Sequence, residues 1–473
     1  MSSGGERAPM LFSNTTILTM NPDREIITDG ALLVRGDRIA AVGKASELRE
    51  AHRDEPFTDL RGGITLPGLI DTHVHTAQCM LRGVSEATPP PDFRSWLFGR
   101  IFSLQGAYTH EDGLASASLC VLEMLKSGTT GFVECLLAEN YGLDGIAQMC
   151  LDSGIRAALG NLVMDVSPDD RDEMGWPVQM WQTRQSGMDL TVEGHRRWTD
   201  PDGRLQIWFG CRSMEPVNNP SLFEEVSALA AEHDIGITIH LSELPHDNEY
   251  ARSLGYRSHM AMAHELGLLG PRTVLAHCTV ADDEDIALLA ATGTTVSHCP
   301  ANNSSSGWGP TRVADMLAAG VNVTLGCDST PSNANMDLLR DLRVAAHVAR
   351  MHDHTRLALS PEQILEMATL NGARALGLGE DLGSLEAGKL ADFIVIDTDA
   401  PHLQPVWSPA ATVVFAAQGA DVDTVVIGGE TIVSGGEILT MDEAAIVADI
   451  RSRKPVVEAR SGVTGIDPPW PVV

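Results

Sequence analysis

The sequence contains no run of 18 apolar residues, and its first residues, MSSGGERAP, lack the apolar core of a secretory signal. Positive charge is scarce as well, because 33 Lys and Arg residues stand against 64 Asp and Glu residues, a formal net charge of −31. A field of that sign repels nucleic acids and anionic lipids. We therefore expect a cytoplasmic protein that has neither nucleic acid nor a membrane as its partner.

No two of the eight cysteines are spaced as C-x-x-C, the pattern typical of metal-binding and redox pairs. A chain of 473 residues is also unlike the small secreted domains that disulfide frameworks stabilise. Several cysteines end apolar, strand-like runs, where the side chain acts as a small buried hydrophobe. We expect reduced thiols in a reducing compartment. The cysteines are Cys79, Cys120, Cys135, Cys150, Cys211, Cys278, Cys299 and Cys327.

Hydrophobic residues make up 43% of the chain, whose length exceeds the usual size of a single core. Both ends are β-rich, with alternating strands and Gly-Asp turns in residues 9–66 and again in 389–399 and 411–436. This texture predicts one small composite β-sandwich formed by both termini. The expected domains are 1–66 and 378–473 for the two parts of the sandwich and its tail, and 67–377 for an α/β catalytic domain.

The middle of the chain alternates apolar strands with helical stretches such as 221–233 and 283–293, the pattern of parallel βαβ units. Eight strands are the number that closes a (β/α)₈ TIM barrel, whose active site lies at the carboxyl ends of the strands. The fold class is therefore α/β. The expected strands are 66–73, 129–136, 155–162, 205–211, 235–241, 273–278, 294–299 and 321–327.

Polar side chains at those strand ends form a coherent metal site. His73 and His75 share one side of the first strand, because side chains at i and i+2 point the same way. Together with His240 and Asp328 they offer three imidazoles and a carboxylate, which suit zinc or ferrous iron and leave room for a water. We expect one divalent ion, with zinc ahead of iron. The other strand ends carry Glu134, Arg212, Glu243, His277 and His298.

A divalent ion lowers the pKa of a bound water from about 15.7 toward about 7 and so supplies hydroxide near neutral pH. Asp328 can take the remaining proton as ligand and base together, and Glu243 can carry a proton to the substrate or leaving group. His277 can orient the water. The plainer interpretations are a solvated loop carboxylate for Glu243 and a buried structural histidine for His277. Glu134 and His298 stay open between support of the ligands and core packing.

These motifs resemble the amidohydrolase superfamily along nearly the whole chain. The resemblance implies a (β/α)₈ barrel and metal-assisted hydrolysis, with His73, His75, His240 and Asp328 as ligands. It makes Glu243 the catalytic acid/base and His277 the water-orienting group. The matching motifs are LPGLIDTHVH (66–75), SGTTGFVE (127–134), ITIHLSE (237–243), VLAHC (274–278), VSHCPANN (296–303), GCDSTPSN (326–333) and GSLEAGKLADFIVID (383–397).

Within that superfamily the HLSE and LAHC motifs resemble the mononuclear deaminase and chlorohydrolase branch. Binuclear members carry a carboxylated lysine at the end of the fourth strand, where FGCRS (209–213) has none. LRGVSE (81–86) and SWLF (95–98) are similar to the melamine deaminase and atrazine chlorohydrolase group and to the S-adenosylhomocysteine and methylthioadenosine deaminases. The segment 408–430 is closer to the triazine-type enzymes.

Two departures concern the substrate. Adenosine-type deaminases have an acidic residue before the tryptophan of SWLF and a histidine after the fourth strand, where this chain has Ser95 and Arg212. Both changes argue against a nucleoside. Arg212 can clamp a carboxylate or a ring oxygen, or it can form a salt bridge to an acidic side chain. Trp308 can stack on the substrate or pack at the rim. The expected substrate contacts are Arg212, Trp308, Ser95 and Asn303.

The sequence thus predicts a metal-dependent hydrolase, a deaminase of an amino-substituted N-heterocycle of triazine, purine or pterin type. Dechlorination or alkylamine release from a triazine-like ring, and hydrolysis of amides, carbamates or ureas, would use nearly the same site. A non-catalytic scaffold conflicts with intact ligands at separate strand ends. A nucleic-acid deaminase would need the H-x-E…P-C-x-x-C signature, which is absent. By analogy with the family we expect a homo-oligomer.

Overall fold

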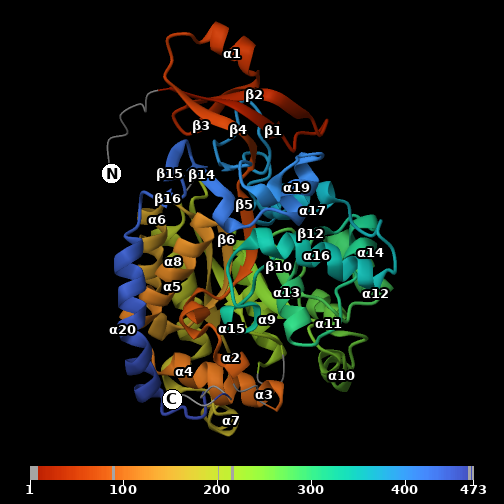
Figure 1. The fold of residues 1–473 in the computed structure, drawn as a ribbon. Helices are drawn as coiled ribbons and strands as arrows, with labels where there is room; N and C mark the ends of the chain where they lie inside the picture. Colours follow the sequence, from red (N-terminus) through yellow and green to blue (C-terminus); the bar gives the residue numbers. More distant parts are fainter. Residues whose placement is uncertain (1–8, 88–90, 201, 215–217, 467–469, 471–473) are drawn as a thin grey trace. The chain divides into compact units, whose positions relative to one another are not determined.

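The computed structural model describes residues 9–87, 91–200, 202–214, 218–466 and 470 (Figure 1). The chain divides into two compact units. One comprises Met1–Asp71, Glu123–Gly131 and Asp337–Met441, and the other comprises Thr72–Leu122, Phe132–Met336 and Asp442–Val473. Among the described residues, no helix is both long enough and apolar enough to cross a membrane.

The second unit is built around an eight-stranded parallel sheet that confirms the predicted barrel. Its strands follow one another in chain order from β5 to β12, and a parallel bridge between Val74 and Asp328 links the two edge strands. The strands are β5 (Leu69–Val74), β6 (Thr129–Leu137), β7 (Arg156–Val163), β8 (Leu205–Cys211), β9 (Ile237–Leu241), β10 (Thr273–His277), β11 (Thr295–His298) and β12 (Asn322–Leu325).

The strands are buried along their length because side chains fill the barrel interior and helices cover its outside. Two glycines make room for that interior. A Cβ added at Gly210 would lie 2.3 Å from the carbonyl oxygen of Cys135, and one at Gly160 would lie 2.5 Å from the same oxygen. Only glycine fits where the inner faces of β6, β7 and β8 approach so closely.

The helices between these strands follow the predicted order, and α9 and α12 match the expected stretches within one residue. The longer ones are α5 (His110–Lys126), α6 (Leu143–Ser153), α8 (Arg184–Trp198), α9 (Pro220–His233), α10 (Pro245–Ser253) and α12 (Asp283–Thr292). Shorter helices carry the loops at the carboxyl ends of the strands. They are η1 (Thr76–Leu81), α2 (Val84–Ala87), α3 (Phe93–Trp96), the π-helical turn η2 (Leu97–Phe102), α4 (Ser103–Gly106), η3 (Glu139–Tyr141), α7 (Pro168–Met174), η4 (Val178–Met180), α11 (His259–Glu265), α13 (Pro300–Ser305), α14 (Val313–Ala318) and α15 (Thr330–Asn333).

The other unit contains a second eight-stranded sheet, which both ends of the chain build together as predicted. The two ends meet where β13 pairs antiparallel with β4. The strands are β1 (Met10–Leu18), β2 (Ile26–Arg35), β3 (Arg38–Lys44), β4 (Phe57–Pro67), β13 (Phe393–Ile396), β14 (Val422–Ile427), β15 (Glu430–Ser434) and β16 (Glu437–Ile438). The unit also holds α1 (Ala45–Ala51), α16 (Leu338–His352), α17 (Pro361–Ala368), α18 (Leu370–Ala375), η5 (Pro401–Leu403), α19 (Pro409–Phe415) and η6 (Gly419–Asp421). The domain boundaries at 66 and 377 stay predictions.

The expectation that residues 411–415 belong to the β-rich C-terminal region is wrong. The segment ATVVF lies in helix α19, although its β-branched residues favour a strand. The start of the helix explains the difference, because the Ser408 side chain accepts a hydrogen bond from the backbone N–H of Ala411 and Pro409 occupies the first helical turn. Local capping and tertiary packing here outweigh the intrinsic preference of the valines.

The chain continues into a 19-residue helix, α20 (Glu443–Ser461), which belongs to the barrel unit. It is attached through Asp112, whose side chain is only 2% exposed. One carboxylate oxygen accepts from Arg453 at 2.9 Å and the other from Arg460 at 2.8 Å. Arg460 also donates to the backbone carbonyl of Ala107 at 2.6 Å. A single buried carboxylate thus holds two turns of the terminal helix.

Asp112→Ala should release α20 from the barrel. Hydrogen bonds to charged groups are worth about 1.5–3 kcal/mol each, but both arginines are partly exposed, so we expect a total loss of about 2 kcal/mol. Limited proteolysis within residues 443–461 should become faster, and the thermal midpoint should fall. Asp449→Ala is the matched control, since Asp449 pairs with the same Arg453 at 2.8 Å from an exposed position. Equal protease sensitivity of the two variants would contradict this role of Asp112.

Candidate active site

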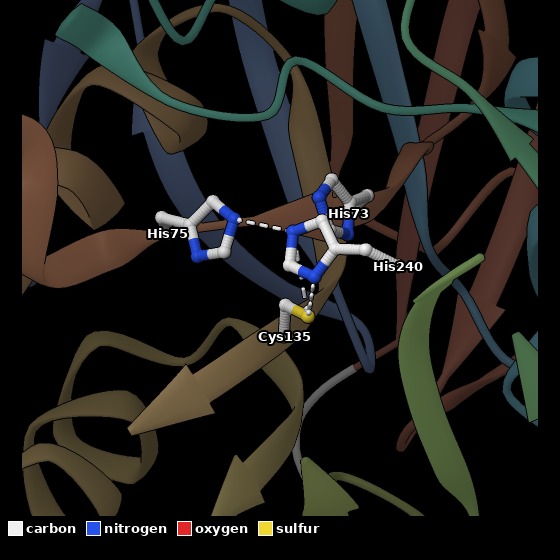
Figure 2. A group of neighbouring side chains, drawn as sticks. All are labelled: His73, His75, Cys135 and His240. Carbon is white, nitrogen blue, oxygen red and sulfur yellow. Dashed lines mark hydrogen bonds between the residues drawn. The ribbon is translucent and has the colours of Figure 1, made fainter. Parts of the chain in front are cut away.

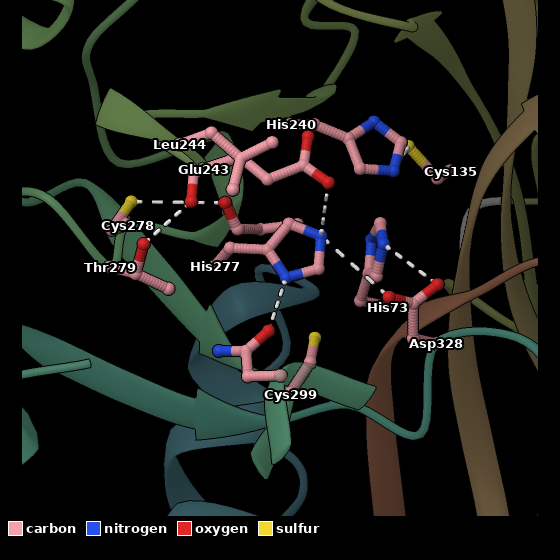
Figure 3. A network of polar contacts seen from close by, with 12 residues as sticks. His73, Cys135, His240, Glu243, Leu244, His277, Cys278, Thr279, Cys299 and Asp328 are labelled. Atoms are coloured by element: carbon pink, nitrogen blue, oxygen red, sulfur yellow. Dashed lines mark hydrogen bonds and ion pairs between the residues drawn. The ribbon is translucent and has the colours of Figure 1, made fainter. Parts of the chain in front are cut away.

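Three imidazoles converge at the carboxyl ends of the barrel strands (Figure 2), and the carboxylate of Asp328 lies next to them (Figure 3). His75 Nε2 lies 3.2 Å from His240 Nε2. Asp328 Oδ1 lies 3.4 Å from His75 Nε2 and 3.7 Å from His73 Nε2. All four side chains are buried. The structure therefore brings together the four side chains that the sequence selects as ligands, although they come from three separate strands.

A hydrogen bond to the backbone sets which ring nitrogen His240 presents to a cation. His240 Nδ1 lies 2.7 Å from the backbone carbonyl oxygen of Arg212, which can only accept, so Nδ1 carries the proton and Nε2 presents its lone pair. Burial lowers the pKa of His75 to about 3 and holds the pKa of His73 and His240 well below 6.5. Neutral imidazoles grouped with a carboxylate fit a divalent ion of the zinc or iron type.

Cys135 belongs to this cluster, a residue that the sequence analysis treated only as a buried hydrophobe. Its sulfur lies 3.6 Å from His240 Nδ1 and 4.0 Å from His240 Nε2 (Figure 2). Its sulfur and one ring nitrogen each of His73, His75 and His240 lie within 4.8 Å of one another. Burial raises the pKa of the thiol well above 9. Its position next to Glu134 at a strand end is the sequence feature that could have indicated its place in the cluster.

Glu134 lies behind the cluster and supports the segment that carries His75. Its carboxylate accepts hydrogen bonds from the backbone N–H of Thr76 at 2.6 Å, from the Thr76 hydroxyl at 2.5 Å and from the N–H of Leu136 at 3.2 Å. Glu134 Oε1 lies 4.0 Å from His75 Nδ1. Burial raises the pKa of Glu134 to about 8, against the lowering effect of these donors. The contacts favour support of the ligands over core packing.

His277 stands between the two candidate acid/base carboxylates (Figure 3). Its Nε2 lies 3.8 Å from Glu243 Oε1 and 3.7 Å from Asp328 Oδ2. Its Nδ1 lies 3.0 Å from Asn303 Oδ1, so the amide orients the ring by accepting the Nδ1 proton. Asn303 therefore supports His277 and is not among the residues that line the cavity, and its contact with a substrate stays a prediction. Burial raises the pKa of Asp328 to about 6.

Two of these side chains sit on strained backbone. His277 has φ 71° and Asp328 has φ 64°, both in the left-handed region that residues with a Cβ seldom adopt. Hydrogen bonds hold both conformations. The N–H of Asp328 donates to the carbonyl of His73 at 2.8 Å, and the Thr311 hydroxyl donates to the carbonyl of His277 at 2.7 Å. Such strain at strand ends is typical of functional sites, where the surroundings fix an unfavourable conformation.

A narrow cavity that opens to solvent lies beside the cluster. Trp308 lines it and meets His277 edge-on, with ring centroids 5.3 Å apart. Arg212 also lines it, with Nη1 3.5 Å from Glu243 Oε2 and its guanidinium carbon 5.7 Å from the centre of the Phe93 ring. The salt bridge to an acidic side chain, one of the two roles considered for Arg212, is therefore present. Further walls are Gln78, Leu97, Asn302 and Ser329, which the sequence analysis did not select.

Ser95 and His298 do not reach the cavity. The Ser95 hydroxyl donates to Asp92 Oδ2 at 3.0 Å, and its backbone N–H donates to Asp92 Oδ1 at 2.7 Å, so Ser95 belongs to the start of helix α3. His298 is buried at the end of β11, and burial lowers its pKa to about 3. Its Nδ1 has no hydrogen-bond partner among the described residues. These positions favour a structural role for both residues.

A family model described as "Amidohydrolase family" matches residues 64–432 of the chain. A second model, an imidazolonepropionase-like composite domain of bacteria, matches residues 30–54. The chain belongs to the amidohydrolase family. Similar proteins include a 5-methylthioadenosine/S-adenosylhomocysteine deaminase of Syntrophobacter fumaroxidans, 33% identical over 95% of this chain and 98% of that protein. A 5'-deoxyadenosine deaminase of Methanosarcina acetivorans is 30% identical over 96% of this chain and 99% of that protein.

Two solved structures of amidohydrolase relatives carry zinc. One is an adenosine deaminase from Xanthomonas campestris with bound zinc, with TM-score 0.85, 27% identity and coverage of 96% of this chain and 99% of that one. The other is a mutant atrazine chlorohydrolase from Arthrobacter aurescens in complex with zinc and atraton. Its TM-score is 0.85 at 26% identity, and the match covers 94% of this chain and 100% of that one. The predicted fold class, family and hydrolase activity are thereby confirmed, and a divalent metal is supported.

Glu134→Gln should weaken metal binding without changing any of the expected ligands. Above pH 8, where Glu134 is ionised, the neutral amide replaces two charge-assisted hydrogen bonds from Thr76 with weaker ones, so the adjacent His75 is held less firmly. Groups that support ligands in this way typically contribute about 10–100-fold in metal affinity. Competition with a chromogenic chelator measures the zinc dissociation constant. Glu139→Gln is the control, because Glu139 is exposed in η3 five residues further on. An unchanged dissociation constant in Glu134→Gln would exclude the supporting role.

Proposed function

We propose that this amidohydrolase is a hydrolytic deaminase that replaces the exocyclic amine of a small N-heterocycle with oxygen and releases ammonia. One observation carries the proposal. Glu243 and Asp328 both approach His277 Nε2, within 3.8 Å, at the edge of a cavity that also holds a cation-binding cluster. This arrangement pairs two proton-transferring carboxylates with a site for an electrophilic ion.

His73, His75, His240 and Asp328 would hold one divalent ion, zinc in our proposal and ferrous iron as the alternative. Such an ion lowers the pKa of a bound water and makes it a nucleophile near neutral pH. The zinc in two solved relatives supports this assignment. Cys135 lies at the same cluster and offers a softer donor beside His240.

The chain's own residues divide the proton transfers. Asp328 accepts a proton from the attacking water, and Glu243 donates a proton to the ring nitrogen next to the carbon under attack. The amine then leaves as ammonia with the proton that Asp328 carries. The added hydroxyl gives its proton back to Glu243, and the ring keeps the oxygen as a carbonyl. His277, oriented by Asn303, hydrogen-bonds the oxygen that adds to the ring. A pKa of Asp328 raised to about 6 by burial suits a group that both takes and returns a proton.

The substrate is a small heterocycle bearing an exocyclic amine, of purine, pterin or triazine type. The deaminase relatives act on adenosine derivatives by name, whereas the solved neighbours include a chlorohydrolase with atraton. Trp308 provides a face on which a flat ring can stack. Arg212 can contact a ring substituent while it pairs with Glu243. The same machinery could expel chloride or an alkylamine, and we expect a homo-oligomer.

A panel of amine-bearing and chlorinated rings tests the reaction. Zinc-loaded protein should release ammonia from at least one aminopurine, aminopterin or aminotriazine, because the two carboxylates can protonate both ring and leaving amine. Glutamate-dehydrogenase coupling measures ammonia, and chloride and alkylamine release are followed in parallel. Simple amides, carbamates and ureas serve as controls. Release of ammonia or amine from these open-chain compounds, with none from the rings, would contradict the proposal. Release of chloride alone would show that the enzyme is a dechlorinating hydrolase instead of a deaminase.

Glu243→Gln should lower kcat by about 10²–10⁴-fold, because a positioned acid/base contributes that much to a hydrolysis. The amide cannot donate a proton to the ring, yet it keeps the size of the side chain. Zinc content by elemental analysis should stay at the wild-type value, since Glu243 is not an expected ligand. Glu249→Gln is the matched control, an exposed carboxylate on α10. A loss of kcat under threefold in Glu243→Gln would remove Glu243 from the mechanism.

A further inference from the structure

Three residues around the cavity each hold a buried polar atom that has no hydrogen-bond partner among the described residues. The atoms are Gln78 Oε1, Asn302 Nδ2 and Arg212 Nη1. Arg212 Nη1 lies 3.5 Å from the carboxylate of Glu243, which compensates its charge, so the two amides are the atoms that need explanation. Buried polar groups are nearly always hydrogen-bonded. A ligand in the cavity can supply the two missing partners.

The surroundings of Gln78 turn its side-chain oxygen into the unpaired group. Gln78 lies in η1, three residues after His75, and the Thr330 hydroxyl donates to its backbone carbonyl at 2.7 Å. Its side-chain Nε2 donates to Gln105 Oε1 at 3.3 Å. Because Nε2 is turned toward Gln105, the group that Gln78 offers to a ligand is the acceptor Oε1.

Asn302 offers the complementary group, a donor. It lies on α13 directly before Asn303, the residue whose amide orients His277. Its side chain is only 2% exposed, and its Nδ2 is the unpaired atom. The two adjacent amides therefore differ in role, because Asn303 supports the histidine of the acid/base group whereas Asn302 lines the cavity.

The order of the strands places these two amides on one side of the barrel. Gln78 follows β5 and Asn302 follows β11, and β12 lies between these two strands in the closed sheet. Helix α15, which follows β12, contacts both η1 and α13. Arg212 and Glu243 follow β8 and β9, and β8 lies opposite β12. A flat ring in the cavity can therefore present one edge to the acid/base carboxylate and another edge to the amides.

We propose that Gln78 and Asn302 bind the edge of the substrate ring that lies away from the leaving amine. Gln78 Oε1 accepts from a ring N–H or a second amino group, and Asn302 Nδ2 donates to a ring nitrogen or an exocyclic oxygen. The preferred substrate therefore carries an N–H donor and an acceptor in addition to the amine that it loses. This inference rests on the proposed deaminase function and narrows its substrate class, since adenines substituted at N9 lack a second N–H donor.

Pairs of rings that differ in the second donor test the preference. 8-Methyladenine keeps the ring N–H that 9-methyladenine lacks, and 6-methylpterin keeps the ring N–H that 3-methylpterin lacks. In the triazine pair, one amino group of 2,4-diamino-6-methyl-1,3,5-triazine is replaced by methyl in 2-amino-4,6-dimethyl-1,3,5-triazine. With zinc-loaded enzyme, kcat/KM for the donor-bearing member of the class that is turned over should be higher by about 100-fold or more, because the other member leaves Gln78 Oε1 buried and unpaired. Equal values, or a preference for the ring without the donor, would overturn the inference.

A matched pair of variants locates the preference at Gln78. Gln78→Met removes the acceptor and keeps the length of the side chain. It should lower kcat/KM for the donor-bearing ring to about the value for the other ring, whose own value should change by less than about threefold. Gln148→Met is the control, because Gln148 is exposed on α6, and it should leave the ratio unchanged. An equal loss for both rings in Gln78→Met would indicate a merely structural role and contradict the proposal.

Asn302 is tested by binding. Asn302→Leu should weaken the binding of both members of a pair by about tenfold, because both carry an acceptor that loses its donor. Ser305→Leu, at an exposed position of the same helix, should leave binding unchanged. Equal affinities of Asn302→Leu and the wild-type protein would overturn the assignment of Asn302.

Binding without turnover separates failure of this inference from failure of the proposed function. The Glu243→Gln variant is titrated with the same pairs of rings while tryptophan fluorescence is recorded. Tighter binding of the donor-bearing member, lost when Gln78→Met is added, supports the contact with the ring edge even if no ring is deaminated. Deamination without any preference in kcat/KM or binding leaves the proposed function standing and removes the role of the two amides. Failure of every ring to bind would overturn the inference as well.

Discussion

The closing contact of the barrel is the constraint on which the rest depends. The N–H of Asp328 donates to the carbonyl of His73 at 2.8 Å, and the N–H of His75 donates to the carbonyl of Asp328 at 3.1 Å. These hydrogen bonds join the first and last strands, and they are made by the backbone of three expected metal ligands. The register of the sheet therefore sets the positions of these ligands directly. Because each strand is held on both sides, the ligand positions share the rigidity of the barrel.

The closed barrel also buries several ionisable side chains of the cluster close together, which is electrostatically unfavourable. His75 Nε2 lies 3.2 Å from His240 Nε2 and 3.4 Å from Asp328 Oδ1. Burial is the main cause that lowers the pKa of His75 and raises that of Asp328. A divalent cation compensates such a site by binding the lone pairs and the carboxylate together. The hydrogen bonds from His240 to the Arg212 carbonyl and from His277 to Asn303 then fix which ring nitrogen is available.

Chemistry and selectivity come from different parts of the barrel unit. The groups that would bind the ion and move protons stand at strand ends, where the sheet fixes them. The surfaces that would contact a substrate come from the segments after β5 and β11, which contribute Phe93 and Trp308. Arg212 and Glu243 connect the two parts, because both side chains line the cavity beside the cluster. One fold can thus keep its hydrolytic site while the loops determine what enters it.

The sequence by itself determined the barrel and the order of its strands, and it indicated which four side chains are expected to bind the ion. Apolar runs and the residues that end them are local features, so His73, His75, His240 and Asp328 could be recognised before any contact was known. It could not reveal that Cys135 joins the cluster or that Asn303 orients His277, because each depends on which side chains meet across distant segments. The helical state of ATVVF was missed because a serine cap and tertiary packing outweigh β-branched propensity. Tertiary structure alone decided the tautomers of His240 and His277 and the cavity beside them, since hydrogen-bond partners and cavity walls meet only after remote elements pack together.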